Sequence, residues 1–436
     1  MLVERPGPLG SARFDGGVWQ GVRMASRDEG LRVLRLCSVF EPPSTALNGR
    51  GARFDPIGGM QDHTAALTRL LDRRGVVQTV LTTRPPTAPW VQRIGARATV
   101  VRVGLPIARP RQLYAIPAMA LVPALARRAE VVHAHLGEDL AILPLAALAA
   151  RSGRLPIVVT IHCSLVHTVP LRDARTALLR AVGGPIERWG VRRADATITL
   201  TPRLAARLAA EVGPDRVHFM RRGVDRRAFG QPCCDAFPRV GRPRVVFLGR
   251  VVRAKGVETL VEAAAQLRTP GAQVLVVGDG ADRRRVEELS RRLGVADRVR
   301  VMGFVPHERV PAVLASADLL VLPSFYEELG TVLIEAMQAG LPAVASRVGG
   351  IPDIVEDGEN GLLVAPGDAT ALARAIDAVL GDPVLSRRLG DGARRRAAAY
   401  DWDVVGEQVL ELYRQLAGRR PPRRRVQAAE GAGCAS

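Results

Sequence analysis

Short apolar runs alternate with longer amphipathic segments along most of the chain, from about residue 31 to residue 417. In the first half the runs are rich in Val, Ile and Leu, which favours strands separated by helices. The predicted strands of this half are Arg32–Phe40, Val76–Leu81, Ala98–Val103, Val131–His135, Ile157–Ile161 and Ala196–Leu200. Its clearest predicted helices are Met60–Arg74, with Leu67, Leu70 and Leu71 on one face, and Arg172–Arg192.

The same alternation restarts near residue 244, after a stretch rich in Gly and Pro. The strands predicted here are Arg244–Leu248, Gln273–Val277, Val299–Met302, Leu319–Leu322, Ala343–Ala345 and Leu362–Val364. The predicted helices are Val257–Leu267, Asp282–Leu293, Pro306–Ala315, Leu329–Ala339, Ala369–Leu380 and Asp403–Ala417. Strands that alternate with helices over short turns are typical of parallel sheets, so we expect an α/β protein with two Rossmann-like domains facing across a cleft.

The interruptions in this pattern predict where the domains begin and end. The expected parts are an irregular extension (1–30), an N-terminal Rossmann-like domain (31–220), a linker (221–243), a C-terminal Rossmann-like domain (244–400), a helix packing back on the N-terminal domain (401–417) and a basic disordered tail (418–436). Met24 is an alternative start, because the first strand-like run begins only at Leu31.

Composition and charge exclude some classes of protein and favour others. The chain has 436 residues, 47% hydrophobic and 24% charged, which is a globular composition, and no apolar run approaches the ~18 residues of a membrane span. A net charge of +19 favours anionic partners, but outside the tail the basic residues are scattered, so nucleic acid is not expected. The 5 cysteines lack metal-ligand spacing, and no secretory signal is present, which favours a cytoplasmic location.

The strongest chemical signal is the run P-S-F-Y-E-E-L-G-T-V-L-I-E-A-M. Glu327 falls in the loop after a predicted strand, and Glu335 lies about two turns further on, in the following helix. Gly330 lets a ligand approach the start of that helix, where free amides and the helix dipole favour a phosphate. A carboxylate accepts two hydroxyl hydrogen bonds at once, which suits a sugar or a ribose. The alternative is two solvated glutamates flanking a helix start.

A second signal, F-L-G-R-V-V-R-A-K-G, places Arg250 and Lys255 after the first strand of the second half. Two cations at a strand end suit a diphosphate whose leaving charge must be stabilised. The alternative is a pair of surface cations in an arginine-rich chain. Lys255 is the only lysine among the 62 basic residues, which indicates a geometry that a guanidinium would not fit.

The N-terminal half carries weaker signals. In D-P-I-G-G-M-Q, Gly58 and Gly59 open a predicted helix, so that backbone amides can face a phosphate from the opposite side of the cleft, although a glycine pair also suits an ordinary tight turn. His133 and His135 end one predicted strand, and His162 ends the next. We expect that His133 and His135 cannot both flank the core, and we favour His135 for the cleft; a structural hydrogen-bonding role is the alternative.

Other ligand classes are disfavoured by motifs that are incomplete. V-G-D-G-A-D-R resembles a dinucleotide-binding loop, but Arg283 stands where the third glycine of that fingerprint belongs, which argues against an NAD-dependent oxidoreductase. There is no Walker A motif. The pair Asp401 and Asp403 flanks Trp402 near the last predicted helix and does not lie in a plausible metal-binding loop, so no metal site is expected.

The order of these motifs resembles a known enzyme family. The motifs are E-x7-E within P-S-x-x-E-x-L-G-x4-E-A, G-R-x4-K-G, G-G-M, H-A-H, T-I-H, R-G-V-D and V-G-D-G. Together they are similar to those of family 4 of the retaining glycosyltransferases, which have the GT-B fold. The resemblance covers roughly residues 31–417 and is most specific between Phe247 and Gly367. Three stretches are also similar to actinobacterial enzymes that glycosylate 2-deoxystreptamine, namely F-D-P-I-G-G-M-Q, R-G-V-V-Q-T-V-L-T and T-I-H-C-S. Two departures are Arg222, where the family usually has Asn, and Cys163, where Gly is common.

The resemblance implies a role for each matching residue. Glu327 would hold hydroxyls of the donor sugar, and Glu335 would hold the nucleotide ribose. Arg250 and Lys255 would neutralise the diphosphate, and His135 would lie beside the sugar. The residues with implied contacts to phosphate, sugar or base are Gly58, Gly59, Val305, Gly330, Thr331 and Val332.

The resemblance also implies a reaction. A hexosyl or N-acetylhexosaminyl group would move from a UDP- or GDP-sugar to an acceptor hydroxyl with retention of configuration, with no bound metal and no further cofactor. The N-terminal domain would take a small-molecule, glycan or lipid-linked acceptor, such as an aminocyclitol. Glycolipid or polysaccharide synthesis for the cell envelope is an alternative, in which the basic tail would contact the anionic inner membrane face. A catalytically silent nucleotide-sugar or nucleic-acid binder is the rival from another class.

Overall fold

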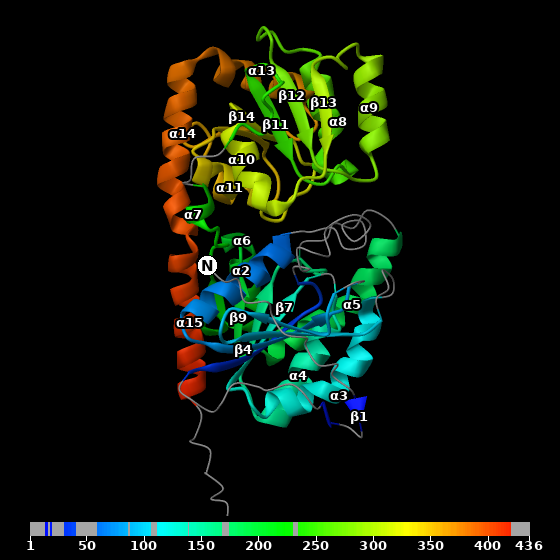
Figure 1. Cartoon of the computed structure of the whole chain (residues 1–436), viewed down its shortest axis with the longest axis vertical. Coiled ribbons are helices and arrows are strands. Elements are labelled where there is room, and N and C mark those ends of the chain that lie inside the picture. The colour runs from blue at the N-terminus through cyan, green and yellow to red at the C-terminus, as the bar shows by residue number, and fades with distance from the viewer. Residues whose placement is uncertain are drawn as a thin grey trace, which may run out of the picture.

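The computed structural model describes residues 30–40, 59–85, 88–105, 111–137, 139–167, 174–229 and 234–419, and the short antiparallel strands β1 (Phe14–Asp15) and β2 (Val18–Trp19). Figure 1 shows two α/β halves stacked along the long axis of the molecule, each built around its own sheet. This arrangement confirms the predicted pair of Rossmann-like units. Most of the predicted extension and the tail beyond Arg419 lie outside the described residues, so the membrane contact of the tail stays a prediction.

The N-terminal half contains an eight-stranded sheet in the order β10-β9-β8-β7-β3-β4-β6-β5, parallel except for β5. Its strands are β3 (Arg32–Cys37), β4 (Val77–Thr83), β5 (Val91–Ile94), β6 (Ala98–Val103), β7 (Val131–Leu136), β8 (Ile157–Ile161), β9 (Ala196–Thr199) and β10 (Val217–Phe219). The helices are α2 (Gly59–Arg73), α3 (Ala115–Ala126), α4 (Ile142–Gly153), α5 (Ala174–Arg193) and α6 (Pro202–Val212). The chain order reverses between β3 and β7, which is the point where ligands bind in doubly wound sheets.

The C-terminal half contains a six-stranded parallel sheet in the order β13-β12-β11-β14-β15-β16. Its strands are β11 (Arg244–Leu248), β12 (Gln273–Val277), β13 (Val299–Gly303), β14 (Leu319–Leu322), β15 (Ala343–Ser346) and β16 (Leu362–Val364). The helices are α8 (Val257–Ala264), α9 (Arg283–Arg292), α10 (Val310–Ala315), α11 (Thr331–Ala339), α12 (Ile351–Ile354), α13 (Ala369–Gly381) and α14 (Pro383–Ala397). Here the reversal lies between β11 and β14.

Most predicted elements agree with these bounds, and the differences have local causes. Edge strands β5 and β10 were not predicted, because each is short and carries few buried side chains. Helix α14 was also missed, although Asp382 caps it by accepting from the amides of Val384 and Leu385. The predicted linker contains the one-turn helix α7 (Arg226–Phe229). The helix predicted from Pro306 is a 3-10 turn at residues 307–309 followed by α10.

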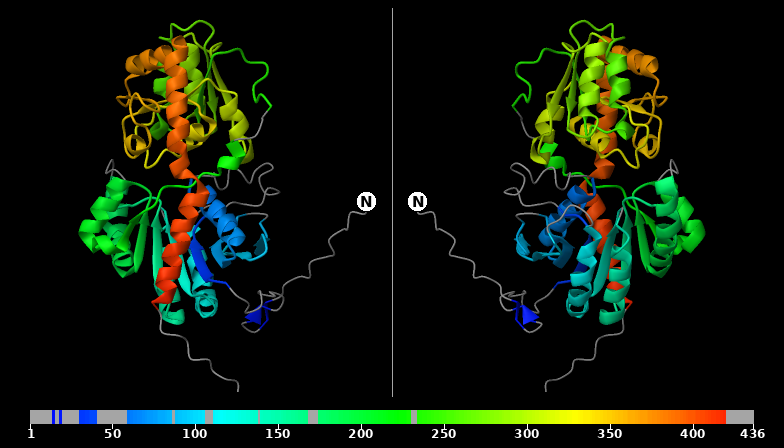
Figure 2. Two further views of the ribbon diagram at one scale, coloured as in Figure 1. Left: turned by 90° about the vertical axis from the view of Figure 1, so that its left-hand side faces the viewer. Right: turned by 90° about the vertical axis from the view of Figure 1, so that its right-hand side faces the viewer.

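Helix α15 (Trp402–Gly418) leaves the C-terminal half and packs on the N-terminal one, as Figure 2 shows. Its apolar face joins α2 and the centre of the first sheet, where Tyr413 and Leu410 are buried beside Leu70. Asp401 caps the helix through the amide of Asp403, so this Asp-x-Asp pair has a structural role. Among the described residues, no helix is long and apolar enough to span a bilayer.

Candidate active site

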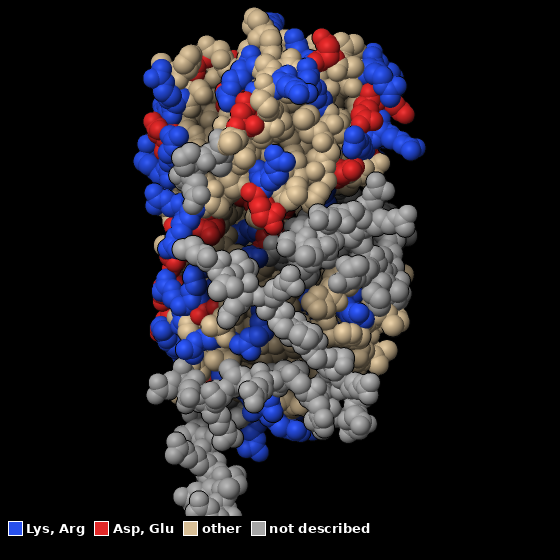
Figure 3. All heavy atoms as spheres, in the orientation of Figure 1, with Lys and Arg blue, Asp and Glu red and all other residues tan. Residues whose placement is uncertain are grey.

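Most of the predicted site residues that the structure describes lie where the carboxyl ends of the two sheets face each other. We call the space between these ends the cleft. Figure 3 shows it as a hollow between the two halves where acidic side chains are exposed. Both reversal points, β3/β7 and β11/β14, open onto it. Loops that follow β11 and β14 form its C-terminal wall, and the start of α2 forms part of its N-terminal wall.

Lys255 and Glu327 form an ion pair on the C-terminal wall. Both side chains are mostly buried, and Ser324 Oγ lies 3.4 Å from Glu327 Oε2. The two loops are joined by backbone, since the amide of Phe325 donates to Ala254 O at 2.9 Å. Gly256 has φ +64°, and a Cβ there would collide with the carbonyl of Pro323. Only glycine therefore lets the Lys255 turn lie against the Glu327 loop.

Helix α11 begins in this loop and points its N-terminus into the cleft. Gly330 precedes it with φ +76°, a conformation that glycine adopts without strain. The first residues of the helix, Thr331 and Val332, are half-buried, so their free amides are available to a ligand. Partial positive charge at a helix start favours a phosphate at this point.

Glu335 lies one turn inside α11 and is buried. Burial raises the pKa of its carboxyl, while the nearby charges of His307 and Arg222 act in the opposite direction. Asp62, on α2 of the other half, raises the pKa further and forms an ion pair with His307 at 3.7 Å. Glu335 therefore lies close to the place where the two walls meet.

Gly59 lies where the two walls approach each other. A Cβ built on it would lie 3.3 Å from Thr331 Oγ1 and 3.2 Å from Arg222 Nη1. The start of α2 thus faces the start of α11, as the predicted phosphate site requires. Gly58 lies outside the described residues.

A buried polar layer lies beneath the N-terminal wall. Arg35 on β3 is fully buried and directs Nη2 to His135 Nε2 at 2.8 Å, while Nη1 donates to Thr68 Oγ1 at 2.5 Å. Because a guanidinium can only donate, His135 Nε2 accepts, and its Nδ1–H then faces His162 Nε2 at 3.2 Å. Burial, with the charge of Arg35 and its neighbours, holds the pKa of these imidazoles well below its usual range; for His162 it is about 3.

The expectation for the two histidines of β7 was wrong. His133 and His135 are both fully buried, and their ring centroids are 4.1 Å apart. Residues two apart on a strand share a face, so both side chains lie on the α2 and α15 side of the sheet, opposite Leu136. His133 bonds Tyr413 Oη at 2.5 Å and Thr160 Oγ1 at 2.7 Å, which is a structural role.

The remaining predicted residues lie on the C-terminal wall. Arg250 follows β11 and is exposed, and Val305 follows β13 and packs half-buried on the second core. Sequence reasoning did not assign functional roles to Arg222, Asp62 and His307, although they lie beside Glu335 or Gly59. The departure from the family motif at Arg222 was the one sequence signal that could have indicated a role for this residue.

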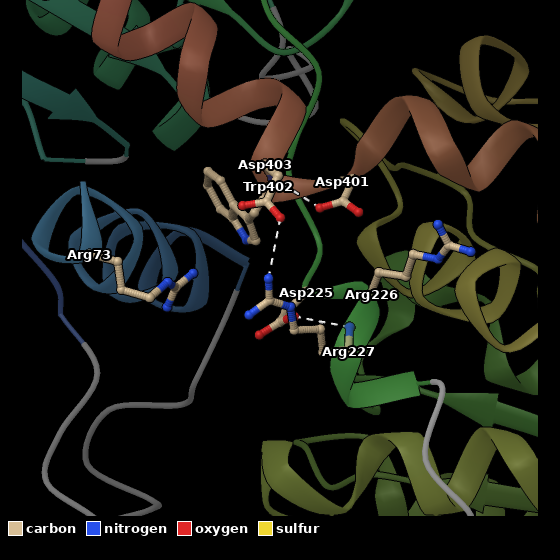
Figure 4. A pocket seen from close by; sticks show the side chains of 7 residues that line it. All are labelled: Arg73, Asp225, Arg226, Arg227, Asp401, Trp402 and Asp403. Carbon is tan, nitrogen blue, oxygen red and sulfur yellow. Dashed lines mark hydrogen bonds and ion pairs between the residues drawn. The ribbon is translucent and has the colours of Figure 1, made fainter.

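Two other features of the described residues resemble binding sites. His63, His135 and His162 bring ligand atoms within 4.8 Å of one another, but Arg35 already occupies His135 Nε2, and this cationic setting is unsuited to a metal ion. A pocket at the crossing between the halves, shown in Figure 4, contains no predicted site residue. It is lined by Arg73, Asp225, Arg226, Arg227, Asp401, Trp402 and Asp403.

Comparison with known proteins matches both halves to glycosyltransferase models. Residues 57–227 match "Glycosyltransferase Family 4", and residues 236–396 match "Glycosyl transferases group 1". A 2-deoxystreptamine N-acetyl-D-glucosaminyltransferase of Streptomyces fradiae is 35% identical, with 89% of this chain and 98% of that protein aligned. An alpha-D-kanosaminyltransferase of Streptomyces kanamyceticus is 34% identical over 80% of this chain and 98% of its own length.

Among solved structures, a sucrose-phosphate synthase from Thermosynechococcus elongatus has a TM-score of 0.73 and 28% identity, with 89% of this chain and 99% of that chain covered. The likeness extends over both halves of the chain.

Proposed function

Because this chain belongs to the hexosyl-transferring glycosyltransferases of family 4, with the GT-B fold, we propose that it moves a hexosyl or N-acetylhexosaminyl group from a UDP- or GDP-sugar to a hydroxyl of an aminocyclitol. The ion pair of Lys255 and Glu327 beside the start of α11 carries this proposal. It combines a phosphate counter-charge with a carboxylate that can accept two sugar hydroxyls. The 2-deoxystreptamine N-acetyl-D-glucosaminyltransferase of Streptomyces fradiae makes an aminocyclitol the first acceptor to test.

In this proposal each wall has its own task. Glu327 orients the donor sugar, and Glu335 accepts hydrogen bonds from the ribose hydroxyls. Arg250, Lys255 and the amides at Gly330, Thr331 and Val332 stabilise the negative charge that develops on the departing diphosphate. On the same wall Val305 lies beside the base, and on the other wall Gly59 approaches the phosphate and His135 supports the sugar side.

Retention of anomeric configuration and independence of metal ions are further parts of the proposal. The departing diphosphate takes the proton of the acceptor hydroxyl on the face where the new bond forms. Cationic side chains and the α11 dipole supply the counter-charge that a metal would otherwise provide. Activity is expected to survive excess EDTA; complete loss that Mg²⁺ or Mn²⁺ restores would contradict this part.

A donor panel with product mass spectrometry tests the reaction itself. UDP- and GDP-hexoses and N-acetylhexosamines are each incubated with 2-deoxystreptamine or with a lipid acceptor. A product of donor sugar plus aminocyclitol, α-linked by NMR from an α-linked donor, supports the proposal. Transfer only to lipid supports cell-envelope synthesis, and donor binding without any turnover supports the silent binder.

A further inference from the structure

Arg222, on the segment between β10 and β11, is a buried guanidinium beside the cleft. Its exposed fraction is 4%, and Nη1 donates to the carbonyl of Gly59, the first residue of α2. Nε is also buried, yet it donates to no residue that the structure describes. A buried donor without a partner costs stability unless a ligand satisfies it.

The position of this guanidinium points to the kind of ligand. Arg222 Nη1 and Thr331 Oγ1 both lie within 3.3 Å of the point where a Cβ of Gly59 would stand. The starts of α2 and α11 therefore meet at Arg222, and both present free amides that favour anions. In the chain, Thr331 comes between Glu327 in the preceding loop and Glu335 in α11, the proposed contacts to sugar and to ribose, and a diphosphate would lie between these two groups.

Charge balance in the cleft gives an independent argument. Lys255 is already paired with Glu327, and Glu335 and Asp62 add two carboxylates close to the proposed ribose site. Arg250 and His307, which pairs with Asp62, can at most balance these carboxylates, so they leave no surplus of positive charge for a diphosphate. Arg222, which is buried in the wall of the cleft, supplies the additional positive charge.

The geometry points to Arg222 as a third cation of the donor site, which binds the diphosphate through its Nε–Nη2 edge where α2 meets α11; this inference rests on the proposed function. Nη1 anchors the side chain to Gly59, and the remaining edge presents two parallel N–H groups to two phosphate oxygens. The family usually has Asn here, so the contact would be particular to chains with this arginine.

Calorimetric titration of the full chain with a nucleoside diphosphate and with its nucleoside tests this role. UDP is compared with uridine, and GDP with guanosine, on wild type and Arg222→Asn. We expect the diphosphate to bind about 10- to 100-fold more weakly to the variant, the range of a lost charged hydrogen bond, and the nucleoside to change less than about twofold. Arg221→Asn, an exposed neighbour with the same charge change, should alter neither.

The outcomes separate this inference from the proposed function. Equal weakening of diphosphate and nucleoside would place the effect at the ribose, and unchanged diphosphate binding would make Arg222 structural; either result overturns the inference. If Arg222→Asn unfolds, Arg222→Gln and Arg222→Lys carry the same comparison, with the lysine variant expected to retain part of the affinity. Failure of wild type to bind UDP or GDP would contradict the proposed function instead.

Discussion

The two halves share a fold but differ in what lies beneath their cleft ends. In the C-terminal half one continuous apolar cluster fills the core, and β11, β12 and β14 contribute mainly Val and Leu to it. In the N-terminal half the apolar residues fall into separate clusters, and a polar layer with Arg35, His133 and His135 lies between two of them.

This difference indicates how each half supports its part of the site. An apolar core stabilises the C-terminal half without taking part in chemistry, so its functional side chains are carried on loops above it. The polar layer of the N-terminal half is both part of the core and adjacent to the cleft. Substitutions there should reduce stability, whereas substitutions on the C-terminal loops should mainly reduce activity.

A fall in pH should lower the stability of the N-terminal half much more than that of the C-terminal half, and this is the largest difference that we expect between them. His63, His133, His135 and His162 stay neutral in the folded state, because their pKa values lie below the usual value near 6.5. Unfolding lets each bind a proton below about pH 6.5, so each costs about 1.4 kcal/mol of stability per pH unit as pH falls from there.

The measurement uses tryptophan, which is absent from residues 234–401 and present at Trp90, Trp189 and Trp402. Urea unfolding followed by tryptophan fluorescence should lose several kcal/mol between pH 7.5 and 5.5. Circular dichroism should show a second transition that changes less. Parallel losses in both signals would contradict the comparison.

Arg35→Ala should give the largest loss of stability from a single substitution. It removes the donor to His135, Thr68 and Gln78 and leaves a cavity, so we expect a loss of about 3–5 kcal/mol in urea unfolding. Arg32→Ala, on the same strand but only half-buried in a pair with Glu130, should cost less than about 1 kcal/mol. Equal costs for the two variants would mean that the polar layer contributes no more than the surface.

Glu327→Ala should cost less stability than Arg35→Ala but reduce kcat by about 10²-fold or more, because it removes a contact to the transferring sugar. Steady-state kinetics with saturating donor measures this effect. Glu328→Ala removes the same charge one residue further on and should retain kcat within about threefold. A lower unfolding midpoint without a change in kcat would make Glu327 a structural partner of Lys255.

Lys255→Arg keeps the charge but should reduce kcat/KM by about 10²-fold. The turn is packed against Pro323 at Gly256, which leaves little room for a larger side chain. We therefore expect the planar guanidinium to displace the phosphate from its position. Arg253→Lys, an exposed exchange in the same turn, is the matched control. Wild-type kcat/KM in Lys255→Arg would show that a point charge is not required there.

Glu335→Ala should have the smallest effect on catalysis. Ribose changes little during the reaction, so the donor KM should rise about 10-fold while kcat stays within about threefold. Because burial raises the pKa of Glu335, the donor KM of wild type should also rise as pH falls and the carboxyl takes up a proton. Kinetic profiles that match those of Glu327→Ala would remove the distinction between sugar and ribose contacts.

The sequence alone determined the features that depend on nearby residues. Hydrophobic periodicity predicted most of the strands and helices, because each buries one face whose spacing is written locally. The positions of Glu327, Gly330 and Lys255 at strand ends followed from the same reasoning. The local rule for side-chain direction along a strand also applied to His133 and His135, and here it was applied wrongly.

The tertiary structure alone decided the contacts between distant segments. Pairing of Lys255 with Glu327, of Arg35 with His135 and of Arg222 with Gly59 joins residues separated by 72, 100 and 163 positions. Motif spacing carries no information about such pairs, because they depend on how helices pack on each sheet and how α15 ties the halves together. The charge balance of the cleft is a sum over those contacts, so only the folded chain shows that Arg222 belongs to it.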